Sequence, residues 1–343
     1  MRSHRITKLL RTFSALLAGT ALLAGCPPTP SWEYGVNGPY AAEIHEIPSP
    51  FFPEKPVTVY LPLGVTTPVP TIFFAHGYGG TEPIFYNTLL THLASLGFAA
   101  VFSPYPTLDP DGILARYDTL WAGFEAAVAA FPTRMDLTRV GFAGHSFGGG
   151  AVPAMARRGI VDSGWGSAGA LLFPMAPWYV HDMTPAELAD FPASATMVVS
   201  LYDDDVLNDH RVAVDLFETI GIPDANKVVL KLFSDDHGTP ALDASHNVPT
   251  GEPFRPEDGL DRYGVRKPLD ALMDWTFNGN TVGRDVALGN GNFDQTFMGT
   301  WPDGTPVVPA EVTDDPVATK PSSTYEFPCV NVLFNPRWAF CPA

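Results

Sequence analysis

The sequence predicts an α/β protein with a mostly parallel central sheet flanked by helices. Three observations predict this fold class. Segments with the pattern of strands alternate along the chain with segments that have the pattern of helices. Several strand segments are short, continuous apolar runs, which is typical of strands covered on both faces. The 343 residues also include 35 Pro and 31 Gly, too many for a coiled coil or a helical repeat.

The individual elements follow from their patterns. Residues 42–47 and 57–61 alternate in the manner of strands, and we expect them to form an antiparallel edge of the sheet. The remaining strands are expected at 71–75, 98–102, 139–143, 168–173, 196–201 and 227–233. Helices are expected at 83–96, where leucines share one face, at the Ala-rich segment 112–130, and at 147–158, 209–220 and 265–277.

The chain is interpreted as one main domain with an extension. No repeat or long linker interrupts residues 40–278. Residues 279–343 are dominated by Gly, Asn, Pro, Thr and Asp and have no clear helical pattern, so we expect a loop-rich C-terminal extension. Cys329 and Cys341 suggest one disulfide that closes a small loop in an exported protein, with two free thiols as the alternative.

The first 25 residues have the composition of a secretory signal. Four basic residues precede an apolar run that is too short to span a bilayer comfortably. The run ends in Leu22-Leu23-Ala24-Gly25-Cys26, which resembles the bacterial lipobox. The resemblance implies cleavage before Cys26, lipidation of that residue and a lipid-anchored protein of the bacterial cell envelope. An ordinary signal peptide is the alternative. The Pro-rich segment 26–39 is interpreted as an extended tether.

The charge balance limits the partners of the protein. Lys and Arg total 20 against 37 Asp and Glu, which gives a formal net charge of −17. A chain this acidic is repelled by phosphate backbones, so we do not expect it to bind nucleic acid. The oligomeric state has no signal in the sequence.

The strongest local motif is Gly144-His145-Ser146-Phe147-Gly148-Gly149, which fits the pattern G-x-S-x-G. It lies between an expected strand and an expected helix, as a nucleophile elbow requires. The glycines leave room for a tight turn, and Ser146 would stand at the edge of the sheet, near the positive end of the following helix. Ser146 is therefore the predicted nucleophile.

A serine hydroxyl needs a base, and the base needs a carboxylate that orients it. Three consecutive acids, Asp203, Asp204 and Asp205, follow the expected strand 196–201. We predict Asp204 as the orienting acid, with the other two as solvated turn residues or helix caps. A calcium site built from the three is a weaker interpretation, because no EF-hand spacing follows.

The base should follow the last strong strand. His237 lies four residues beyond the expected strand 227–233, and His246 lies further along the same loop. The strand-to-loop distance favours His237, but loops at this edge vary in length, so His246 stays open as the alternative.

The remaining site residues are predicted from the loops around the nucleophile. A tetrahedral intermediate needs two backbone donors, for which we predict Phe147, directly after the nucleophile, and Tyr78, within the sequence His76-Gly77-Tyr78-Gly79-Gly80. Trp178 and Tyr179, in the loop after 168–173, are predicted to wall an apolar substrate group, with core packing as the alternative.

Taken together, these motifs resemble the α/β-hydrolase superfamily over residues 40–278. They are most similar to the branch of dienelactone hydrolases, chlorophyllase-like esterases and cutinase-like polyester hydrolases, although dienelactone hydrolases use a Cys nucleophile. The resemblance implies an α/β-hydrolase fold and a serine carboxylic-ester hydrolase that works through an acyl-enzyme on a small or polymeric ester, with no metal or organic cofactor. A peptidase or acyltransferase on the same fold, and a catalytically inactive binding lipoprotein, are the alternatives.

Overall fold

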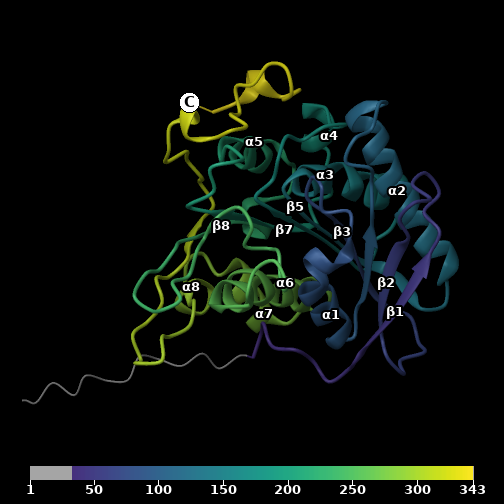
Figure 1. The fold of residues 1–343 in the computed structure, drawn as a ribbon, viewed down its shortest axis with the longest axis horizontal. Helices are drawn as coiled ribbons and strands as arrows, with labels where there is room; N and C mark the ends of the chain where they lie inside the picture. Colours follow the sequence, from purple (N-terminus) through teal and green to yellow (C-terminus); the bar gives the residue numbers. More distant parts are fainter. Residues whose placement is uncertain (1–32, 343) are drawn as a thin grey trace, which may run out of the picture. The chain divides into compact units, whose positions relative to one another are not determined.

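A nine-stranded, mostly parallel sheet forms the centre of the protein (Figure 1). The computed structural model describes residues 33–342. The strand order is β1-β2-β4-β3-β5-β6-β7-β8-β9. The strands from β4 to β8 pair in parallel, whereas β1, β2 and β9 add antiparallel pairs at the edges. Their bounds are β1 Ala42–Ile47, β2 Val57–Pro62, β3 Val69–Ala75, β4 Ala99–Ser103, β5 Met135–His145, β6 Gly169–Met175, β7 Thr196–Tyr202, β8 Lys227–Leu232 and β9 Glu311–Thr313.

Helices cover both faces of the sheet. One face packs against α2 (Gly112–Ala130), α3 (Phe147–Ala156) and α5 (Arg211–Thr219). The opposite face packs against α1 (Asn87–Ser95), α6 (Lys267–Asn278) and α7 (Thr281–Leu288). The other helical segments are η1 Pro83–Tyr86, η2 Arg157–Asp162, α4 Pro185–Ala189, η3 Asp224–Asn226, η4 Leu260–Arg266, α8 Phe293–Thr296, η5 Ser322–Thr324 and η6 Trp338–Phe340.

The continuous apolar runs are explained by these two helical layers. In β3, Phe73 packs into the core on the α2–α3 side, whereas its neighbours Ile72 and Phe74 pack into the core on the α1–α6 side. Because successive side chains of a strand point to opposite faces, a strand that is covered twice must be apolar at every position. The predicted α/β class and the antiparallel first strands are confirmed.

The extension after residue 278 is more structured than its composition predicts. The expectation of no helix there is wrong for α7, whose Val286, Ala287 and Leu288 are buried in the core on the α1–α6 side. Asn280 caps this helix by accepting a hydrogen bond from the amide of Val282. Residue 278 is therefore no boundary of the core: residues 33–342 lie in one compact unit, and β9 extends the sheet beside β8.

The predicted disulfide is present in the structure. Cys329 and Cys341 are bonded, and they close a loop near the end of the chain. Within residues 33–342, every helix is too short or too polar to cross a bilayer. The predicted signal peptide, Cys26 and the first half of the predicted tether lie outside the described residues. The prediction of an extended tether is wrong for residues 33–39, because the Tyr34 hydroxyl and the amides of Gly35 and Gly38 donate hydrogen bonds to side chains of α6 and α1.

The crossing of α3 over the sheet requires two glycines. A β-carbon placed on Gly148 would lie 2.0 Å from the carbonyl oxygen of Ala75 in β3, and one placed on Gly144 would lie 2.5 Å from the carbonyl oxygen of Gly148. Both distances are far below van der Waals contact and both involve backbone, which cannot rotate away. Side chains are therefore excluded where the helix leaves the strand.

We predict that Gly148→Ala lowers the free energy of unfolding by about 3 kcal/mol or more, because the new methyl group overpacks the contact with β3. Chemical denaturation followed by circular dichroism measures this change. Gly259→Ala is the matched control, since Gly259 has a helical φ of −61° and an added β-carbon would come no closer than 3.6 Å to any neighbour. A loss at Gly259 equal to that at Gly148 would contradict the steric explanation.

Candidate active site

One cavity of about 820 Å³ lies at the edge of the sheet where the parallel strands end. Loops after β3, β5, β6, β7 and β8 line it, which is where ligands of open α/β sheets bind. The cavity contains the predicted Ser146, Tyr78, Phe147 and Trp178 and the alternative base His246. Its other lining residues include Tyr86, Arg116, Leu207, Asn208, Phe327 and Phe334.

Ser146 sits on a strained turn between β5 and α3. Its φ of 56° is in the left-handed region, which a non-glycine residue rarely adopts. Three main-chain hydrogen bonds hold it there: its amide donates to Met175, and its carbonyl accepts from Gly150 and Trp178. The turn is thus fixed from β6 on one side and from its own helix on the other, with its side chain facing the cavity.

His246 and Asp205 form a buried pair on the wall of the same cavity. The Nδ1 atom of His246 lies 2.7 Å from the carboxylate of Asp205, which is 1% exposed. The other carboxylate oxygen of Asp205 accepts hydrogen bonds from the amides of Leu207 and Asn208, which fix its orientation. Because a carboxylate accepts but does not donate, Nδ1 carries the proton and Nε2 is left as the basic atom.

The hydroxyl of Ser146 has one side-chain partner in the described part of the chain. The side-chain amide of Asn208 donates to this hydroxyl from 3.4 Å, and the same amide donates to the carbonyl of Ala176 from 2.8 Å. No hydrogen bond joins Ser146 to His246 within residues 33–342, although both line the cavity. Proton transfer between them requires an approach to about 3 Å, which catalytic pairs often make when substrate binds.

The structure does not bring the predicted acid Asp204 and the predicted base His237 to this site. The carboxylate of Asp204 is half exposed and accepts a hydrogen bond from Ser234. The imidazole of His237 pairs with Asp303 at the surface and contacts the ring of Trp301. Neither residue lines the cavity. The structure therefore places the alternative base His246, hydrogen-bonded to Asp205, in the same cavity as Ser146, and leaves the favoured pair outside it.

The reason lies in the path of the loop after β8. Asp235 and Leu242 exchange two backbone hydrogen bonds, which close a small antiparallel turn. His237 lies inside this turn and is carried away from the sheet edge, whereas His246 follows its return. Counting residues from the end of the strand does not reveal such a turn. The Pro240 of Gly238-Thr239-Pro240 was the available signal that the chain reverses before His246.

The loop that is predicted to supply an oxyanion donor lies directly against Ser146. A β-carbon placed on Gly77 would lie 3.4 Å from that of Ser146. The next residue, Tyr78, lines the cavity with Phe147, as expected for the two predicted donors. Gly150 is the first residue of α3 whose amide bonds back to Ser146, so the amide of Phe147 has no acceptor within the helix.

A buried chain of hydrogen bonds connects the three loops. The amide of Gly77 donates to the Tyr86 hydroxyl, which lies 2.9 Å from His145 Nδ1, and His145 Nε2 lies 2.9 Å from the carbonyl of His246. Burial lowers the pKa of His145 well below its usual value, and the nearby His246 lowers it further. The neutral ring therefore donates from Nε2 to the carbonyl and accepts from Tyr86 at Nδ1. His145 therefore holds the backbone of His246 in place.

His76 braces the same loop from inside the protein. Its Nδ1 donates to the carbonyl of Gly77, its Nε2 accepts from the amide of Tyr105, and the two rings stack 4.0 Å apart. Burial lowers the pKa of His76 to about 3. The ring is thus neutral in the folded protein at ordinary pH and serves as a fixed spacer under the loop.

The two predicted aromatic residues have different positions. Trp178 lines the cavity and stacks on Phe147, with ring centroids 5.6 Å apart. The prediction that Tyr179 walls the substrate is not supported by its placement. Its side chain is fully buried and donates a hydrogen bond to the carbonyl of Pro328 in the C-terminal segment. Tyr179 therefore holds that segment instead of facing the cavity.

Sequence reasoning missed the contribution of the C-terminal segment to the site. Glu326, Phe327 and Phe334 line the cavity, and the amides of Glu326 and Phe327 donate to the carbonyls of Val206 and Leu207. Arg116, from α2, also lines the cavity and donates to the carbonyls of Pro106 and Thr107. The aromatic residues near Cys329 were the available signal, but composition alone indicated a loop.

The weaker interpretation of a calcium site receives no support from the described residues. Within 33–342, no group of three or more His, Cys, Asp or Glu side chains is arranged to hold a metal ion. Asp203 pairs with Lys320 and Lys231, and Asp205 is occupied by His246 and two amides.

No protein-family model matches the sequence, and no curated protein matches it. The function must therefore be argued from the residues of the site itself.

We predict that the stability of the protein falls as the pH drops from about 6.5 toward about 3, in part because of His76. The unfolded chain binds a proton near the ordinary histidine pKa of about 6.5, whereas the folded ring does not until about 3. At pH 5 this difference costs about 2 kcal/mol.

Denaturant titrations between pH 6 and pH 4.5 test this assignment. His76→Gln should reduce the dependence of the unfolding free energy on pH by about 1 kcal/mol per pH unit, since one proton fewer is bound on unfolding. Equal slopes for the parent and the variant would show that His76 is not buried in its neutral form.

Proposed function

We propose that the protein is a serine hydrolase of carboxylic esters with an α/β-hydrolase fold, in which Ser146 is the nucleophile, His246 the base and Asp205 the orienting acid. The buried Asp205–His246 hydrogen bond, on the wall of the cavity that contains the strained Ser146, is the observation that carries the proposal. The order Ser, Asp, His along the chain and the parallel sheet agree with this class.

The chemistry follows from the three side chains. Ser146 Oγ attacks the carbonyl carbon of the ester while His246 Nε2 takes the hydroxyl proton. Asp205 keeps the proton on Nδ1 and stabilises the imidazolium that forms. The backbone amides of Tyr78 and Phe147 stabilise the negative oxygen of the tetrahedral intermediate. The imidazolium then gives its proton to the leaving alcohol, and a water molecule activated by His246 hydrolyses the acyl-enzyme.

The lining of the cavity favours an apolar ester. Tyr78, Phe85, Phe147, Trp178 and Phe327 surround the nucleophile, and aromatic side chains of this kind bind apolar acyl or aryl groups. The proposal includes export to the bacterial cell envelope and a lipid anchor on Cys26, which rest on the N-terminal sequence.

We predict that Ser146→Ala, His246→Ala and Asp205→Asn each lower kcat for a p-nitrophenyl ester by about a thousandfold or more. The three substitutions remove the nucleophile, the base and the carboxylate that orients the base, respectively. Steady-state hydrolysis of p-nitrophenyl butyrate measures the loss. A fluorophosphonate probe should label the parent protein and leave Ser146→Ala unlabelled.

His237→Ala and Asp204→Asn are the matched controls, since they belong to the same two loops but lie outside the cavity. Both should keep kcat within about twofold of the parent. Activity that survives in His246→Ala and disappears in His237→Ala would contradict the assignment. A well-folded parent protein that neither reacts with the probe nor cleaves any ester would refute the proposed function.

A further inference from the structure

The loop closed by the disulfide presents apolar side chains to solvent. Between Cys329 and Cys341, six large apolar residues are roughly half exposed or more: Val330, Val332, Leu333, Phe334, Trp338 and Phe340. Leu333 is the most exposed of them, at 83%. Scattered apolar residues are common on protein surfaces, but six of them within one short closed loop indicate a surface that binds a partner.

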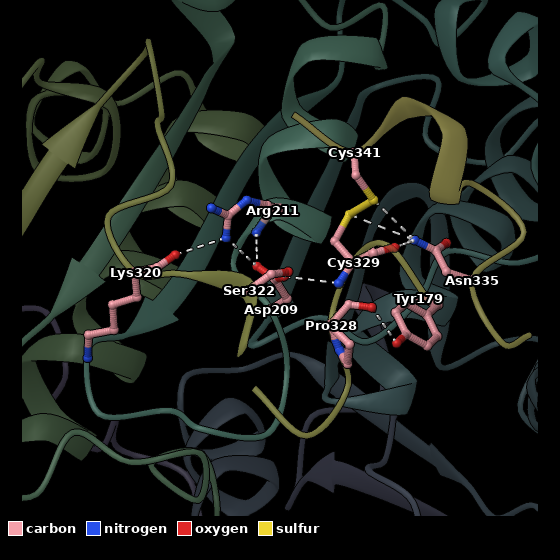
Figure 2. Close-up of polar contacts among 9 residues, drawn as sticks. All are labelled: Tyr179, Asp209, Arg211, Lys320, Ser322, Pro328, Cys329, Asn335 and Cys341. Carbon is pink, nitrogen blue, oxygen red and sulfur yellow. Dashed lines mark hydrogen bonds and ion pairs between the residues drawn. A yellow bond between two sulfur atoms is a disulfide. The ribbon is translucent and has the colours of Figure 1, made fainter. Parts of the chain in front are cut away.

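The loop is held in place by the interactions at its base. The side-chain amide of Asn335 donates to the carbonyl of Cys329 from 2.7 Å, within the disulfide-closed loop. At the entry to the loop, the buried carboxylate of Asp209 accepts hydrogen bonds from the amide of Cys329 and the hydroxyl of Ser322, as Figure 2 shows. The exposed apolar side chains thus sit on a braced segment.

The same loop presents no free charge. Arg337 is its one ionisable residue, and its guanidinium makes a bidentate ion pair with Asp215 of α5, at 2.6 and 2.7 Å. Arg337 is 3% exposed. The outer surface of the loop is therefore apolar and uncharged, while the protein as a whole carries a net charge of −17. A surface that binds this loop must be apolar and cannot be strongly anionic.

The apolar surface is continuous with the candidate active site. Phe334 is one of the six exposed residues and also lines the cavity. Phe327, just before the loop, lines the cavity as well and packs edge-on against Trp178. A partner bound to the loop would therefore lie at the mouth of the cavity that contains Ser146.

We propose that the Cys329–Cys341 loop docks the mouth of the cavity on the surface of an aggregated, uncharged ester, such as a droplet. The identity of the partner as an ester rests on the proposed function, whereas the docking itself rests on exposure, charge and position. The loop supplies the apolar contact, and the cavity receives single ester molecules from the surface that the loop covers.

Flotation with tributyrin droplets tests the docking without turnover. The full-length chain carrying Ser146→Ala should bind the droplets, and adding Leu333→Ser and Trp338→Ser should weaken this binding at least tenfold. The matched control adds Ile44→Ser and Leu63→Ser instead, which removes two exposed apolar side chains near the β1–β2 edge. Since the N-terminal residues are the same in all three proteins, their contribution cancels.

Equal binding by all three proteins would overturn the proposal. So would binding to vesicles of anionic phospholipid in preference to the droplets. Analytical ultracentrifugation tests whether a second copy of this chain binds the loop instead. A dimer of the parent that dissociates when the loop residues are substituted would show that it does and would overturn the proposal.

Activity distinguishes this proposal from the proposed function. With Ser146 intact, the loop substitutions should leave hydrolysis of dissolved p-nitrophenyl acetate within about twofold and lower hydrolysis of emulsified tributyrin at least tenfold. Equal losses on both substrates would show that the loop shapes the site rather than docking it. If the parent cleaves no ester, the proposed function fails, and droplet binding still decides whether the loop docks.

Discussion

The geometry of the site depends on one constraint, the tight turn at Ser146 between a central strand and its helix. The turn is possible because β3, β5 and β6 lie side by side, and because the glycines that flank it, Gly144 and Gly148, let backbone atoms approach closely. The left-handed φ of Ser146 costs roughly 1–3 kcal/mol, and the residue keeps this conformation because three backbone hydrogen bonds hold it. With Ser146 fixed, the other residues of the candidate site need only be brought to the cavity by loops.

Those loops are connected to one another by buried polar contacts. The chain from Gly77 through Tyr86 and His145 to the carbonyl of His246 joins the predicted oxyanion loop, the elbow and the loop of the base. Because each of these groups is buried, removing one would leave a partner unsatisfied at a cost of about 1–3 kcal/mol. His145, at a position that G-x-S-x-G leaves unspecified, lies at the centre of this network.

The sequence was informative wherever a local pattern determines the structure. The apolar runs predicted the strands, and G-x-S-x-G predicted the turn at Ser146, because both depend on residues close together in the chain. The choice between Asp204 and Asp205, or between His237 and His246, depends on how a loop folds back over the sheet edge. The turn that Asp235 and Leu242 close sets that path, and it has no strong local signature. Tyr179 and α7 were misjudged for the same reason, since tertiary packing decided their roles.

The attachment of the C-terminal segment has a consequence for how the protein can change over evolutionary time. Its entry is fixed by backbone pairing with residues 206–209 and by the carboxylate of Asp209, none of which depends on the identity of the exposed side chains. The residues of the closed loop can therefore diverge while the fold and Ser146 are retained. Selection can act on this segment separately and leave the residues around Ser146 unchanged.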